Sequence, residues 1–250
     1  MNSIVYISCQ LITILLVIGL AGAIIFAVRR TLQKIKFRDT KDYIQYLQLA
    51  LIFWLFILAT LAVEDFFTPF DQNLYNLIFA FSIPAILVIF LSFNRTFGRL
   101  LRLLPATWLI RIQAFRILLE LMFWLGYKGD FVPIQMTFEF LNQDIIVGLT
   151  ALFAASLFFG KGRFRRLEAI IWNFFGILLL INLLIVSFYS YPSPFQVFNY
   201  LPNSSFLADI PFIWIVGFLI PFGLAMHLFS LRQVFLMSPQ KKRILIGIIK

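Results

Sequence analysis

The sequence predicts an all-α fold: a polytopic membrane helix bundle with seven transmembrane helices, the N-terminus outside and the C-terminus in the cytoplasm. Hydrophobic residues make up 62% of the 250 residues, charged residues only 13%, and the mean hydropathy is +0.94. A water-soluble globule of this size cannot bury so much apolar surface. Apolar runs of membrane length recur along the chain, and basic residues collect in alternate connections between them.

A helix that crosses a bilayer needs roughly 20 mostly apolar residues. Runs of this kind lie at residues 4–28, 44–63, 74–93, 106–126, 144–159, 169–190 and 210–231. Met1–Gln10 has no basic residue and no small-residue cleavage site follows the first run, so we expect this run to remain as a helix. The fifth run is short, and Ile244–Ile249 is too short to span. We therefore expect residues 1–250 to form a single integral-membrane domain.

Lysine and arginine are distributed unevenly between the connections. Eighteen of the 21 lie in the segments 29–43, 94–105, 160–168 and 232–250, whereas the alternate connections hold only Lys128. The connections that are poor in lysine and arginine carry most of the acidic residues, which are Glu64, Asp65, Asp71, Asp130, Glu139, Asp144 and Asp209. Because basic loops stay in the cytoplasm, this pattern predicts the orientation. The net charge of +10 indicates topology and contact with anionic membrane lipids, since no aromatic-interleaved basic platform for nucleic acid is present.

The fourth run contains the polar residues that are most informative about function. Gln113, Arg116 and Glu120 share one stripe of the expected helix, and both charges fall near the bilayer midplane. Charge at that depth is costly, so it should face the bundle interior and be paired. Two interpretations remain open: Arg116 and Glu120 neutralise each other or pair with neighbouring helices as a staple, or they line a polar pocket or proton path. Available partners are Thr150, Asn173 and Asn182.

A second polar group lies at the outer start of the fifth run. Asp144 is well placed to cap that helix, because a carboxylate accepts hydrogen bonds from free backbone N–H groups. Capping does not account for Glu139 and Asn142, which are candidates to bind a cation or a ligand's polar group at the outer mouth. The long outer connections Lys128–Gln143 and Tyr191–Ala208 are rich in Phe, Tyr and Pro. They fit either an interfacial aromatic belt or a cap over a cavity that opens outward.

Cysteine and histidine usage excludes several kinds of site. Cys9 is the only cysteine, so one chain can form neither a disulfide nor a thiolate metal cluster. His227 is the only histidine and lies about 27 Å along the last helix from Asp209, too far to share a metal with the outer carboxylates. A packing or hydrogen-bonding role is favoured for His227. We expect no metal and no cofactor, and the chain has no Gly-rich phosphate loop or serine-hydrolase elbow.

Several short motifs from Arg111 onward can be read together. They are Arg111-x-x-x-x-Arg116-x-x-x-Glu120, Met136-Thr137-Phe138-Glu139, Asn142-x-Asp144-Ile145 with Gly148-Leu149-Thr150-Ala151, Pro192-Ser193-Pro194-Phe195-Gln196, and His227-x-x-Ser230-Leu231-Arg232-Gln233. This set resembles an uncharacterised family of bacterial multi-pass integral membrane proteins. That family commonly carries Glu-Gly before its Asn-x-Asp, whereas this chain has Glu139-Phe140-Leu141. No activity is assigned to the family, so the resemblance implies topology and marks positions without implying chemistry.

Three functions are compatible with these patterns. The favoured one is ligand binding or transport through a polar centre on the fourth helix. The candidate binding residues are Gln113, Arg116, Glu120, Glu139, Asn142 and Asp144. A membrane-embedded enzyme acting on a lipid or isoprenoid is an alternative, disfavoured because no His–Asp, Asp–Asp or Ser–Lys pair is visible; a structural or assembly subunit of a membrane complex is another. Expected partners are membrane lipids and a small-molecule or ion ligand, and no nucleic acid is expected. The expected location is a cell membrane, such as a bacterial inner membrane. Assembly into a homo-oligomer or a membrane complex remains open.

Overall fold

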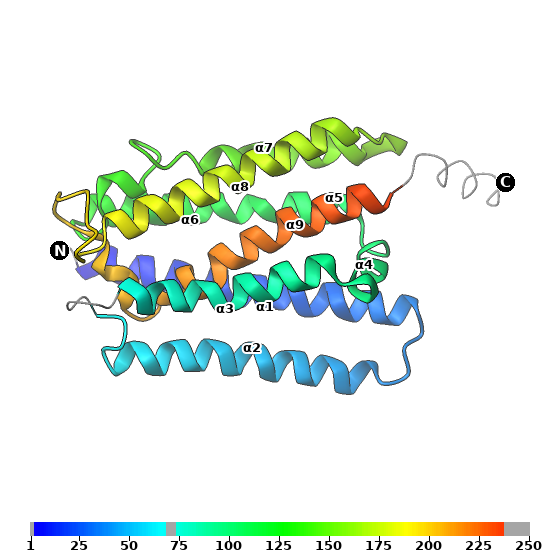
Figure 1. Cartoon of the computed structure of the whole chain (residues 1–250), viewed down its shortest axis with the longest axis horizontal. Coiled ribbons are helices and arrows are strands. Elements are labelled where there is room, and N and C mark those ends of the chain that lie inside the picture. The colour runs from blue at the N-terminus through cyan, green and yellow to red at the C-terminus, as the bar shows by residue number, and fades with distance from the viewer. Residues whose placement is uncertain (1–2, 69–73, 238–250) are drawn as a thin grey trace.

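The computed structural model describes residues 3–68 and 74–237, and in these ranges every regular element is a helix (Figure 1). The main helices are α1 (Ser3–Lys34), α2 (Thr40–Val63), α3 (Leu74–Phe93), α4 (Arg95–Leu101), α5 (Ala106–Arg111), α6 (Phe115–Lys128), α7 (Ile145–Phe159), α8 (Arg166–Tyr189) and α9 (Ile220–Leu236). Short helical turns are η1 (Ile112–Ala114), η2 (Ile134–Met136), η3 (Gly160–Gly162), η4 (Ser204–Ala208) and the π-helical η5 (Ile215–Leu219). Asp71 and the basic tail with its Ile244–Ile249 run lie outside the described residues.

Five helices in the described residues are long and apolar enough to cross a membrane. They are Ser3–Lys34, Thr40–Val63, Leu74–Phe93, Arg166–Tyr189 and Ile215–Leu236, the last formed by η5 and α9 together. The other two expected spans take different forms. The run predicted at 106–126 is α5, η1 and α6 in direct succession, with one 3-10 turn at its centre, and the run predicted at 144–159 is the 15-residue helix α7.

The helices differ greatly in how much of their surface other helices cover. In the most apolar window of Ile215–Leu236, 78% of residues are buried, whereas in Thr40–Val63 only 6% are. Figure 1 accordingly shows α9 running through the bundle and α2 along one edge. Large apolar side chains such as Phe53, Phe153 and Leu178 face outward, on surfaces suited to lipid. The described helices are therefore those of a membrane protein by length and surface chemistry.

Two indole hydrogen bonds connect helix α2 to η5 and to the residue before it. Pro221 has no N–H to donate to the carbonyl of Gly217 four residues earlier, and that carbonyl accepts a 2.8 Å hydrogen bond from Trp54 Nε1 of α2. In return, Trp214 Nε1 donates to the carbonyl of Leu55, at 3.0 Å. The missing N–H of a proline thus coincides with a helix irregularity and with an anchor for the outermost helix.

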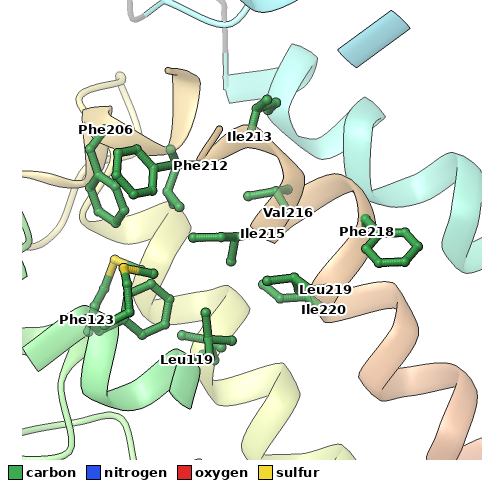
Figure 2. Packing of buried hydrophobic residues seen from close by; sticks show 14 of the residues in the cluster. Leu119, Phe123, Phe206, Phe212, Ile213, Ile215, Val216, Phe218, Leu219 and Ile220 are labelled. Atoms are coloured by element: carbon green, nitrogen blue, oxygen red, sulfur yellow. The ribbon is translucent and has the colours of Figure 1, made fainter. Parts of the chain in front are cut away.

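The largest apolar core lies toward the end of the bundle where α1 begins. Figure 2 shows Phe206 of η4 beside Phe212, with Phe123 of α6 below them and η5 running from Ile215 toward Phe218 on the other side of the view. The rings of Phe206 and Phe212 meet edge to face at 5.4 Å. We call this the acidic end, because Asp209 lies there and accepts a hydrogen bond from Tyr6. Both long connections pack onto this end, where the Tyr191 hydroxyl donates to the carbonyl of Phe67.

Candidate polar centre between α6 and α7

Arg116 of α6 is completely buried and forms an ion pair with Asp144, the residue immediately before α7. Both side chains have an exposed fraction of 0%. The two helices approach closely here because Gly148 has no side chain; a Cβ at that position would lie 2.8 Å from Ile117 Cγ1 and 3.3 Å from Arg116 Cβ. The ion pair therefore joins two helices at a fully buried point, where each charge depends on polar groups of the protein.

Gln113 of η1 connects Arg116 to the central helix α9. Its side-chain oxygen accepts a hydrogen bond from Arg116 Nε at 3.1 Å, and its side-chain nitrogen donates to the carbonyl of Gly223 at 3.0 Å. A Cβ on Gly223 would lie 2.9 Å from Arg116 Nη2, so this glycine makes room for the guanidinium. The 3-10 turn, the arginine and α9 thus meet at one place.

Glu120, one turn after Arg116, is bound by Asn142 from the connection before α7. Asn142 Nδ2 donates to Glu120 Oε1 at 2.5 Å and to the carbonyl of Met136 at 2.9 Å. Asn142 Oδ1 accepts from the backbone N–H of Asp144 at 3.2 Å. Asn142 therefore links the two carboxylate residues, and we call Gln113, Arg116, Glu120, Asn142 and Asp144 together the polar centre.

The polar centre contains two carboxylates and one guanidinium, all with zero exposure. Three of its atoms have no hydrogen-bond partner in the part of the chain that the structure describes: Arg116 Nη2, Glu120 Oε2 and Asp144 Oδ2. If both carboxyl groups were ionised, the centre would carry one uncompensated negative charge. A buried charge is tolerated only when it is paired or neutralised. One proton or one small cation would balance the set.

The role predicted for Asp144 as a helix cap is wrong. Asp144 is the first residue before α7, but its backbone is already in the right-handed helical region and its side chain makes no capping hydrogen bond. The carboxylate turns instead to Arg116, because a buried guanidinium needs an acidic partner, whereas the backbone N–H groups of Ile146 and Val147 already donate to the carbonyls of Gln143 and Asp144.

Other expected contacts are also corrected. Arg116 and Glu120 do not bind each other; Arg116 pairs with Asp144, and Glu120 accepts a hydrogen bond from Asn142. The partners suggested for them lie elsewhere: Asn182 donates to the carbonyl of Leu141, and Thr150 donates to its own helix. Pairing of both charged side chains with residues outside α6 is compatible with both interpretations of the fourth run, a staple and a polar site.

Glu139 is not part of the polar centre. Its side chain is exposed, accepts a 2.7 Å hydrogen bond from Trp124 Nε1 and lies 3.5 Å from Lys128 Nζ. The expected grouping of Glu139 with Asn142 and Asp144 at one mouth is therefore divided. Asn142 and Asp144 turn inward, and Glu139 remains on the surface.

His227 forms a second buried polar group with Asn173 and Ser230. His227 Nδ1 and Asn173 Oδ1 lie 3.0 Å apart, and Asn173 Nδ2 donates to Ser230 Oγ at 3.0 Å. The imidazole lies on Gly176, where a Cβ would be 2.2 Å from His227 Cε1. The predicted packing and hydrogen-bonding role of His227 is confirmed. The sequence did not single out Gln135, a buried amide whose nitrogen and oxygen both lack a partner among the described residues.

Comparisons with family models, curated proteins and solved structures give no match for this chain. Among the described residues, no three His, Cys, Asp or Glu side chains are grouped as a metal ion would require. The chemistry of the polar centre must therefore be argued from its own geometry.

Proposed function

We propose that this membrane protein binds one proton or one monovalent cation at its polar centre, and that this binding accompanies transport through the bundle. The observation that carries the proposal is the excess of carboxylates: Asp144 pairs with Arg116, the single guanidinium of the centre, while Glu120 is bound only by the neutral amide of Asn142, and all have zero exposure. A structural staple needs only one carboxylate, whereas a second one in the same dry network requires a positive partner.

Two helix irregularities beside the centre support movement as part of this function. The 3-10 turn η1 carries Gln113, whose amide binds Gly223, and Gly223 follows the π turn η5 and Pro221 along the chain. Such interruptions are where helices bend and where functional sites are often built. Because the centre is fully buried, a bound ion can exchange only if these helices separate. The irregularities supply places at which that can happen.

A structural role is the second candidate, and the complete burial favours it. The Arg116–Asp144 pair joins α6 to α7, and Gln113 joins η1 to α9. In that case Glu120 only supports Asn142, which in turn positions the connection before α7. The two candidates differ in whether Glu120 holds an exchangeable positive charge.

Purified protein in neutral detergent separates the candidates. Thermal unfolding is followed in sodium, potassium, lithium or bulky organic-cation chloride at one ionic strength, and infrared difference spectra report any protonated carboxyl group. We expect either a selective cation shift or a carboxylic acid band, lost in Glu120→Gln. The matched control is Glu139→Gln, which removes an exposed carboxylate outside the centre and should keep the signal. Absence of both signals in the wild type would overturn ion binding and leave the staple.

We also propose that seven segments cross the membrane, with the N-terminus outside and the C-terminus in the cytoplasm. In support, α5, η1 and α6 follow one another without a break, a run of about 34 Å at about 1.5 Å per residue. Helix α7 packs along this run, and Arg111 Nη2 donates to Ser156 Oγ at 2.9 Å. The resemblance to a bacterial family is the basis for an inner-membrane location.

Side-chain contacts support grouping the basic connections at one end of the bundle, which we call the basic end. Lys34 Nζ at the end of α1 donates to the carbonyl of Leu103, and Gln233 near the end of α9 donates to the carbonyls of Leu101 and Leu104. Reporter fusions test the orientation. Fusions at Ile35, Gly98 and Arg163 should be cytoplasmic, and those at Thr68, Gln135 and Tyr200 external; external activity at Arg163 would refute seven spans.

A further inference from the structure

We infer that a pocket at the basic end of the bundle binds a phosphate group, carried by an anionic membrane lipid or by a free phosphate compound. The pocket has a volume of about 430 Å³ and is lined by Arg95, Arg99, Arg102, Arg232 and Leu236. It uses no residue of the polar centre, so it stands independently of the function proposed above.

The four arginines of the pocket have no acidic partner among the described residues. In the ranges 3–68 and 74–237, ion pairs involve Arg116, Lys128 and Arg165, and none of the pocket arginines. Arg99 Nη2 donates to Thr96 Oγ1 at 3.2 Å, and Arg232 Nε is buried with no hydrogen-bond partner in the part of the chain that the structure describes. Like charges in one pocket repel each other unless an anion lies between them. The unpartnered Arg232 Nε is a second sign that the pocket lacks an acceptor.

The sequence builds one wall of the pocket from the short helix α4. Asn94 begins it by accepting a 3.0 Å hydrogen bond from the backbone N–H of Phe97. Arg95, Arg99 and Arg102 follow at intervals of four and three residues, so they project from one face.

The other wall comes from α9, and it is fixed closely against α4. A Cβ on Gly98 would lie 3.2 Å from Leu236 Cδ1 and 3.5 Å from Arg232 Nε, so the glycine lets both of these side chains lie against α4. Gln233 Nε2 donates to the carbonyl of Leu101 at 2.6 Å and to that of Leu104 at 2.7 Å. The pocket walls are thus held together by uncharged contacts, which keep the arginines near one another despite their repulsion.

The chemistry of the pocket fits phosphate. Guanidinium groups bind phosphate oxygens with paired, charge-assisted hydrogen bonds, a geometry that a lysine ammonium does not reproduce. The pocket opens where α3 and α9 end, and Phe93 and Phe235 beside those ends are exposed. Exposed apolar side chains next to a basic pocket suit a lipid, whose chains lie along the helices while its headgroup phosphate enters the pocket.

Full-length protein in neutral detergent tests the inference. Bound phospholipid is counted by native mass spectrometry after adding short-chain phosphatidylglycerol or phosphatidylcholine, and inorganic phosphate is compared with chloride by thermal shift at equal ionic strength. We expect selective binding of phosphatidylglycerol, of inorganic phosphate, or of both; the first identifies a lipid source and the second a free one. Binding of neither probe would overturn the inference.

Three double variants distinguish a built pocket from general positive charge. Arg95→Gln with Arg232→Gln should weaken binding roughly fivefold for each arginine removed. The matched control Arg29→Gln with Arg38→Gln removes two exposed charges near the end of α1, and should bind like the wild type. Arg95→Lys with Arg232→Lys keeps the charge and should still weaken binding. Equal losses in pocket and control variants, or undiminished binding by the lysine variant, would show diffuse attraction instead.

Discussion

The polar centre and the four-arginine pocket are both groups of charged side chains, but they differ in burial and in pairing. In the centre, Arg116 and Asp144 are completely buried and bind each other. In the pocket, Arg95, Arg99 and Arg102 are exposed and have no carboxylate partner among the described residues. Water and ions can solvate the second group, whereas the first depends entirely on its protein neighbours.

This difference separates what each group contributes. A buried pair is expensive to break because the remaining charge cannot reach water. An exposed, unpaired charge contributes little to folding, so its retention in a defined pocket is better explained by binding. Mutations in the polar centre should therefore change mainly stability, and mutations in the pocket should change mainly ligand binding.

The largest effect is expected from Asp144→Ala. It leaves Arg116 buried without its carboxylate, and should lower the free energy of unfolding by about 3–5 kcal/mol. Arg116→Met with Asp144→Leu removes both charges and should recover most of the loss. Denaturant unfolding in detergent provides the measurement. If Asp144→Ala lowered the free energy of unfolding no more than Glu139→Ala on the surface does, the ion pair would not depend on burial as described.

A smaller loss, about 1–3 kcal/mol, is expected from Gly176→Ala. The new Cβ would lie 2.2 Å from His227 Cε1, so the imidazole must move and its hydrogen bond with Asn173 must lengthen. Gly22→Ala in α1 is the matched control, because nothing lies within 4 Å of its Cβ position. That control should be neutral or slightly stabilising, through helix propensity. Thermal unfolding of the two variants side by side tests how tightly the buried polar groups are packed.

Glu120→Gln should alter stability by less than about 1 kcal/mol, because the amide oxygen can still accept from Asn142. Glu120→Ala removes that acceptor from a buried donor and should cost about 1–2 kcal/mol. Chemical unfolding of both variants measures the difference. A Gln variant as unstable as the Ala variant would mean that the charge itself is needed for folding.

The smallest effect is expected from Arg95→Gln with Arg232→Gln in the absence of phosphate or anionic lipid. Stability should remain within about 0.5 kcal/mol of the wild type, or rise slightly as repulsion is relieved. Melting temperatures without added ligand provide the check. A loss comparable with that of Asp144→Ala would place these arginines among the folding contacts and end the contrast between the two regions.

Hydropathy correctly predicted an all-helical chain, and five of the expected spans appear as helices long and apolar enough to cross a membrane. It could not show that the fourth contains a 3-10 turn, because apolar periodicity does not register where backbone hydrogen bonds shift by one residue. The short fifth run, predicted at 144–159, appears as the 15-residue helix α7. For the site, the periodicity of the fourth run placed Gln113, Arg116 and Glu120 on one stripe, and all three side chains are buried.

What the sequence by itself determined is therefore local: a lipid-facing composition, the segregation of basic residues, and costly charge in the fourth run. Only the tertiary structure decided that Arg116 pairs with Asp144 rather than with Glu120, and that Arg232 lies against α4 beside Gly98. Residues four apart on a helix are always neighbours, and so a sequence suggests their pairing first. A partner from another helix becomes available only when the two backbones approach closely, as Gly148 permits here, and in a water-free interior that partner can satisfy the charge more fully.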